Sequence, residues 1–161
     1  MTALMTAINH NDILAVQNLI QKGADVNELD ANQDAPLVIA AYKGYTEIVT
    51  TLLEAGADVT AVDPGMKATA LHAAAYAGRT EAAKVLIAYK IDIDKQGPYN
   101  GYTALHDATW QNHVETAKVL IEAGANLEIK SRDGQTALDL ARARDYKKIV
   151  ALIEQKMRPG I

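Results

Sequence analysis

The sequence has neither cysteine nor phenylalanine, and its aromatic residues are seven tyrosines and one tryptophan among 161 residues. Without cysteine the chain forms no disulfide, offers no thiolate metal site and has no cysteine nucleophile. Without phenylalanine, a core must be built from leucine, isoleucine, valine and alanine. Such small side chains favour thin, closely spaced helices.

Long apolar runs and clusters of basic residues are also missing. No run approaches the about 20 apolar residues that span a bilayer, and the start, MTALMTAINHND, lacks the basic and apolar segments of a signal peptide. The formal net charge is −4 with scattered Lys and Arg, so the electrostatic footprint of a nucleic-acid binder is absent. We therefore expect no nucleic-acid and no membrane partner. The compartment is unknown; a cytoplasmic location is favoured, and an exported form whose signal was removed before Met1 stays open.

What the sequence does contain is an internal repeat. One leucine recurs at spacings of 33, 34, 34 and 33 residues, as Leu4, Leu37, Leu71, Leu105 and Leu138. Around it stand segments such as TALHAAAYAGR (69–79) and TALHDATWQNH (103–113), each followed by a second apolar pattern such as TAKVLIEAGANLE (116–128). Apolar residues at spacings of three and four predict two short helices per unit. One unit cannot bury its apolar face alone, and stacked neighbours complete the core.

Capping residues mark where these helices begin and end. A threonine precedes the first helix of four units, where its hydroxyl can accept a free amide: Thr2, Thr69, Thr103 and Thr136. In the second unit Pro36 takes the first helical position, and Asp34 is a candidate cap. A glycine suited to a left-handed helix end follows three of the second helices: Gly23, Gly56 and Gly124. Lys90 stands there in the third unit and costs about 1–2 kcal/mol if it is left-handed, unless that helix ends differently.

These motifs resemble those of the ankyrin repeat family. The resemblance covers residues 2–156 in five units, through the Thr-Ala-Leu-His and Gly-Ala-Asp-Val-Asn patterns. It implies an all-α fold, in which helix-turn-helix units joined by β-turn loops stack into a right-handed, curved solenoid with a concave groove. We expect one domain over 1–161, with repeats at about 1–29, 30–62, 63–96, 97–129 and 130–156 and with the first and last acting as caps.

Motifs for catalysis and for cofactor binding are missing. No phosphate-binding glycine loop and no H-E-x-x-H pair occurs, so we expect no enzyme, no catalytic residue, no cofactor and no metal ligand. By resemblance, His72, His106 and His113 are structural hydrogen-bonding groups. The alternative for His106 and His113 is a metal site with Asp107 or Glu115 as third ligand.

The tryptophan belongs to a recurring aromatic position. Trp110 lies five residues after its leucine, and Tyr42 and Tyr76 lie five residues after theirs. The resemblance places this position at the end of the first helix, on the concave face used to bind partners. Aromatic residues and arginine dominate binding hot spots; the alternative is that these rings pack on one another and shield the seam between repeats. The candidate partner-binding residues are Tyr42, Lys43, Tyr76, Tyr99, Tyr102, Trp110, Gln111 and Arg144.

The leading functional prediction is a non-catalytic protein–protein interaction module that binds an unidentified partner protein or peptide in its groove. One alternative is a regulatory or targeting segment of a longer protein. It is motivated by the first unit, which lacks a leading turn and has Leu14 where other units have Glu47, Glu81, Glu115 and Lys148. Leu14 is then either covered by preceding residues or simply a tolerated surface leucine. Another alternative is a small-ligand or metal-binding solenoid. A monomer is the simplest expectation for a capped solenoid.

Overall fold

The structure is a computed structural model that describes residues 2–158. Within these residues it is all-helical, with one isolated β-bridge between Val62 and Thr69 and no β-strand. None of the helices in this part of the chain is long and apolar enough to cross a bilayer. The helices are α1 (Ala3–Asn9), α2 (Ile13–Gln21), α3 (Pro36–Lys43), α4 (Thr46–Glu54), α5 (Ala70–Ala77), α6 (Thr80–Ala88), α7 (Ala104–Trp110), α8 (Val114–Glu122), α9 (Ala137–Ala143) and α10 (Lys147–Met157).

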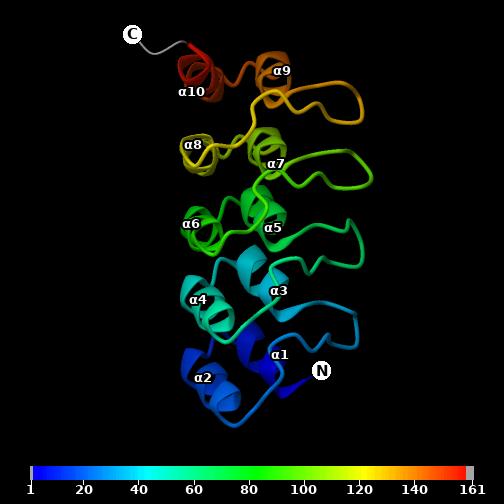
Figure 1. The fold of residues 1–161 in the computed structure, drawn as a ribbon, viewed down its shortest axis with the longest axis vertical. Helices are drawn as coiled ribbons and strands as arrows, with labels where there is room; N and C mark the ends of the chain where they lie inside the picture. Colours follow the sequence, from blue (N-terminus) through cyan, green and yellow to red (C-terminus); the bar gives the residue numbers. More distant parts are fainter. Residues whose placement is uncertain (1, 159–161) are drawn as a thin grey trace.

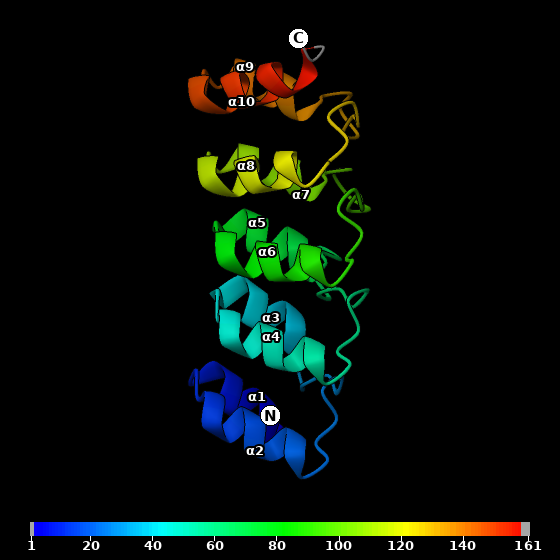
Figure 2. The same cartoon turned by 60° about the vertical axis from the view of Figure 1, so that its left-hand side comes forward.

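The helices stack as antiparallel pairs in two columns (Figure 1). The odd-numbered helices, called inner helices below, form one column, and the even-numbered outer helices form the other. The long loops between pairs project from the side of the inner helices, and the side view in Figure 2 shows the pairs stacked from the amino terminus to the carboxyl terminus. Each helix packs on its own pair partner and on the equivalent helix of the next pair. This arrangement confirms the predicted helical solenoid.

Four of the five inner helices begin after the predicted threonines. The Thr69 hydroxyl accepts the His72 N–H at 3.3 Å, while Nδ1 of His72 accepts the Thr69 N–H at 3.2 Å. The same reciprocal capping box joins Thr103 to His106 and, through a carboxylate, Thr136 to Asp139. Such a box satisfies two of the backbone donors that every helix start leaves free.

The expected cap at Asp34 is wrong. Ala35 is the N-cap of α3, and no side chain accepts a hydrogen bond there. Pro36 takes the first helical position and removes one of the donors that a cap would otherwise satisfy. The Asp34 side chain therefore does not cap α3.

Alanine lets the inner helices approach closely, as the lack of phenylalanine predicted. Six alanines on α3, α5 and α7 are completely buried: Ala40, Ala41, Ala70, Ala74, Ala75 and Ala108. The recurring leucines of these helices are at most 2% exposed. A core this thin has no room for a tryptophan, which explains why Trp110 stands at a helix end.

Two kinds of residue adopt the left-handed conformation after the outer helices. The predicted glycines have φ of +95°, +92° and +96° at Gly23, Gly56 and Gly124, and Lys90 has φ of +66°. Lys90 thus keeps the left-handed turn without the glycine that relieves its strain. Of the two possibilities raised by the sequence, the left-handed lysine is the one observed.

Candidate binding groove

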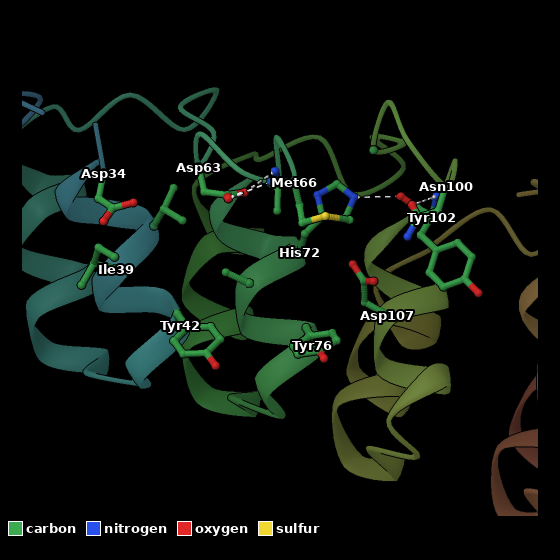
Figure 3. A pocket seen from close by; sticks show the side chains of 14 residues that line it. Asp34, Ile39, Tyr42, Asp63, Met66, His72, Tyr76, Asn100, Tyr102 and Asp107 are labelled. Atoms are coloured by element: carbon green, nitrogen blue, oxygen red, sulfur yellow. Dashed lines mark hydrogen bonds between the residues drawn. The ribbon is translucent and has the colours of Figure 1, made fainter. Parts of the chain in front are cut away.

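A pocket of about 520 Å³ lies between the projecting loops and three inner helices (Figure 3). Helices α3, α5 and α7 form its floor, and loop residues 63–68 and 97–102 form its rim. Its apolar lining includes Val38, Ile39, Met66, Ala68 and Ala73. The pocket therefore spans three consecutive helix pairs, and much of its lining is apolar.

The recurring aromatic position is called the ladder below (Tyr42, Tyr76 and Trp110), and two of its three residues line this pocket. Tyr42 and Tyr76 stand near the ends of α3 and α5 and are 51% and 47% exposed. Each shares no close ring contact with another aromatic side chain of residues 2–158. Their rings are thus free to meet a partner, and the alternative in which the ladder rings pack on one another does not describe these two.

The backbone beneath these tyrosines is held by the following helix pair. Nε of Arg79 donates to the Tyr42 carbonyl at 3.0 Å, and Nε2 of His113 bonds the Tyr76 carbonyl at 3.0 Å. Arg79 and His113 are the N-cap residues of α6 and α8. Because the anchors come from the next pair, the aromatic positions are fixed relative to one another along the stack. The prediction that His113 is structural is consistent with this bond.

Trp110 forms a separate cluster beside the pocket. It is 38% exposed, and the Arg144 guanidinium lies 3.6 Å from its ring centroid, a cation–π geometry. The Tyr102 ring meets Trp110 edge-on at 6.1 Å and stacks on His106 at 5.2 Å. Rings in this part of the groove do pack on one another. The ladder is therefore divided into two open tyrosines and one partly covered tryptophan.

The remaining predicted residues lie around the pocket without lining it. Lys43 and Gln111 are half-buried at the ends of α3 and α7. Tyr99 is 52% exposed near the tip of its loop, and its carbonyl accepts a hydrogen bond from Arg132 at 3.3 Å. Of the eight candidates, the pocket brings together Tyr42, Tyr76 and Tyr102.

Local hydrogen bonds shape the two loops at the rim. The Asp63 carboxylate accepts the N–H groups of Gly65, Met66 and Ala68 at 2.9, 2.9 and 2.7 Å, which holds the turn that presents Met66. In the second loop Gly101 has φ of +72°, and an added Cβ would lie 2.7 Å from the backbone nitrogen of Arg132. That nitrogen donates to the Asn100 carbonyl at 2.8 Å, so glycine is required where these two loops meet.

The buried histidines join neighbouring loops. Nδ1 of His72 accepts the Thr69 N–H, so the proton lies on Nε2, which donates to the Tyr102 carbonyl at 2.9 Å. His106 repeats this arrangement with the Gln135 carbonyl at 2.9 Å. Burial lowers the pKa of both imidazoles and keeps them neutral. Within residues 2–158 no three His, Asp or Glu side chains are grouped so that they could hold a metal, and the His106 ring is engaged as described.

Three carboxyl groups line the pocket, and sequence reasoning did not assign them to it. Burial raises the pKa of Asp107 to about 8. Burial, followed by the nearby Asp30 and Asp63 carboxylates, raises the pKa of Asp34. The carboxyls of Asp34 and Asp107 have no hydrogen-bond donor or cationic partner within the described part of the chain. Only Asp63 among the three is engaged, by the amides of its own loop.

Comparisons with known proteins agree with this architecture. A family model described as "Ankyrin repeats (3 copies)" matches residues 1–63 and again residues 61–131. Palmitoyltransferase AKR1 of Candida albicans is 41% identical over 58 residues, which are 36% of this chain and 7% of that protein. The probable E3 ubiquitin-protein ligase XBOS31 of Oryza sativa subsp. japonica is 35% identical over 71 residues, 44% of this chain and 16% of that protein. The chain thus aligns with only a small part of each of these relatives.

Proposed function

The chain belongs to the ankyrin repeat family, whose repeats generally mediate protein–protein interaction, and from this premise we propose that it is a non-catalytic interaction module. In this proposal the groove formed by the inner helices and the loops binds a partner protein or an extended peptide. A solenoid suits this task because its stacked units offer a long continuous surface.

One observation carries the proposal: Tyr42 and Tyr76 stay exposed at equivalent helix ends inside one pocket. Exposed rings in an apolar pocket of this kind are typical of binding surfaces. Their backbone carbonyls are fixed by Arg79 and His113. A rigid aromatic surface loses little conformational freedom on binding, which favours affinity.

The histidines support a non-catalytic role. Both ring nitrogens of His72 and of His106 are used in bonds between loops and helix starts. A general base must instead present a free nitrogen to a substrate proton. These rings are thus employed in holding the scaffold together.

Affinity capture from a lysate of the source organism tests the proposal. Wild type is compared with Tyr42→Ala/Tyr76→Ala and with Tyr89→Ala, in which the tyrosine removed is 40% exposed at the end of outer helix α6. Circular dichroism first establishes that all three proteins are folded. A protein retained by wild type and Tyr89→Ala but lost by the double variant is expected. Equal retention by all three proteins contradicts binding in the groove.

A second candidate is a targeting segment within a longer protein. The observation that favours it is the small share, 7% and 16%, that the matching regions occupy in the two curated relatives. The complete transcript tests this candidate: a reading frame that extends well beyond these residues supports it, and one limited to them contradicts it.

A further inference from the structure

We infer that the pocket between α3, α5 and α7 receives a lysine or arginine side chain of the partner segment, with Asp107 as its counter-ion. This inference rests on the proposed function and specifies the chemistry of the partner. It follows from the charge, the walls and the length of the pocket.

Among the residues that the structure describes, the carboxyl groups of the lining have no basic side chain beside them in the pocket. Asp34, Asp63 and Asp107 line the pocket, and no lysine or arginine of the described residues does. The one imidazole in the lining, His72, is neutral because its Nδ1 accepts a backbone N–H. The Asp63 carboxylate already accepts three N–H groups of its own loop, whereas Asp34 and Asp107 have no such donor among the described residues. Charge complementarity therefore points to a cationic group of the partner.

The walls of the pocket suit the stem of a long basic side chain. Lysine and arginine pack their methylene groups on apolar surface while the charged end reaches a polar group. Ala73 of α5, the helix next to α7, supplies such a surface. The Tyr76 ring on the same helix adds a face that attracts a cation in a partly dehydrated site.

Asp107 gains most from such a partner. It is half-buried in the pocket wall (Figure 3), and the burial that raises its pKa to about 8 is compensated by no described donor. A cation brought beside it lowers this pKa again and stabilises the carboxylate, so binding at neutral pH releases a proton. The titratable and charged side chains on the neighbouring elements include His72 and Tyr76 of α5, Asp63 and Tyr102 of the rim, and Asp133 and Arg144 of the last repeat.

The occupant is a side chain on an extended segment and not a metal ion. No group of three or more His, Asp or Glu within residues 2–158 is placed to hold a metal. The floor crosses α3, α5 and α7, and neighbouring helices pack about 10 Å apart, so the pocket is about 20 Å long. An extended chain covers that distance in about six residues.

A peptide selection tests the inference. Wild-type protein is immobilised as the target, and a displayed library of random peptides of about twelve residues is selected for binding to it. Enriched sequences are synthesised with arginine and with its uncharged isostere citrulline. Binding is measured calorimetrically to wild type and to Asp107→Asn. Glu122→Gln is the matched control, because it makes the same carboxyl-to-amide change at an exposed position on outer helix α8.

We expect enriched peptides to share a basic residue, and its change to citrulline to weaken binding to wild type by about tenfold or more. The same change has little effect on Asp107→Asn, while Glu122→Gln behaves as wild type. If the enriched peptides lack a basic residue but bind Tyr42→Ala/Tyr76→Ala more weakly than wild type, the basic occupant is wrong and groove binding stands. If no peptide is enriched over the bare support, both the basic occupant and groove binding are wrong. The same holds if the enriched peptides bind the tyrosine double variant and wild type equally.

Discussion

The two buried histidines show how one residue type serves both a helix start and a contact between repeats. Each accepts an N–H from its capping threonine on Nδ1 and donates from Nε2 to a carbonyl in the next loop. Protonation would place a hydrogen on Nδ1 and abolish the first bond. Burial, the largest contribution to the lowered pKa of both rings, acts in the same direction.

The stability of the protein should therefore depend on these histidines at mildly acidic pH. Their pKa is lower in the folded chain than the ordinary value of about 6.5, so the unfolded chain binds more protons between these values. Their contribution is complete above about pH 6.5 and is lost as the pH falls toward the folded pKa. Urea unfolding at about pH 7.5 and about pH 5.5 measures this loss.

The control is His72→Gln/His106→Gln, because glutamine at this position keeps a capping box but does not titrate. We expect the free energy of unfolding of wild type to fall more steeply with acid than that of the double variant. Effects of the carboxyl groups are common to both proteins and cancel. Parallel curves would show that the imidazoles do not titrate on unfolding.

Leu105 and Trp110 test the separation between core and surface within one helix. Leu105 is 2% exposed and Trp110 is 38% exposed. We expect Leu105→Ala to lower the free energy of unfolding by about 2–5 kcal/mol. Trp110→Ala should cost about 1 kcal/mol, chiefly through its contacts with Arg144 and Tyr102. Equal losses in denaturant titrations would place Trp110 in the core and remove it from the candidate binding surface.

At the scale of the element, the ends of the outer helices share one backbone conformation but differ in sequence. Gly124 adopts φ of +96° after α8, and Lys90 adopts φ of +66° after α6. The third repeat keeps the turn because the surrounding helix pairs determine the chain path. Strain at this position is stored in the native state.

Substitution of both residues measures that strain. Lys90→Gly should raise the free energy of unfolding by about 1 kcal/mol, since glycine adopts the left-handed region without a Cβ penalty. Gly124→Ala is the reverse change, and since nothing lies within 4 Å of the added Cβ, its cost is due to the backbone alone. We expect it to lose about 1 kcal/mol. A stabilising alanine or a destabilising glycine in thermal melts would contradict this explanation.

At the scale of the whole molecule, the stacked fold was predictable because its signals are local and recur. The capping threonines and the buried leucines each act within one repeat, so one unit predicts the next. Asp34 shows the limit: its residue type suits a cap, yet Pro36 starts the helix without one. The repeat boundaries themselves remain a prediction.

The candidate site was only partly predictable, because it combines residues of several repeats. Alignment of the units identified Tyr42 and Tyr76 as equivalent, and both line the pocket. Asp107 has no acidic equivalent in the same position of the other units, so no pattern indicated that it faces the pocket. Likewise, the position of Arg144 over Trp110 depends on how one unit is set on the next.

The proposed function depends on the tyrosines of the groove binding the partner. The most direct test is the dissociation constant of the captured partner, measured by calorimetry for wild type, Tyr42→Ala/Tyr76→Ala and Tyr89→Ala. Loss of two ring anchors should raise the dissociation constant of the double variant by about 100-fold, with Tyr89→Ala within about twofold of wild type. Equal affinity of all three proteins would contradict the account and place the binding surface elsewhere on the solenoid.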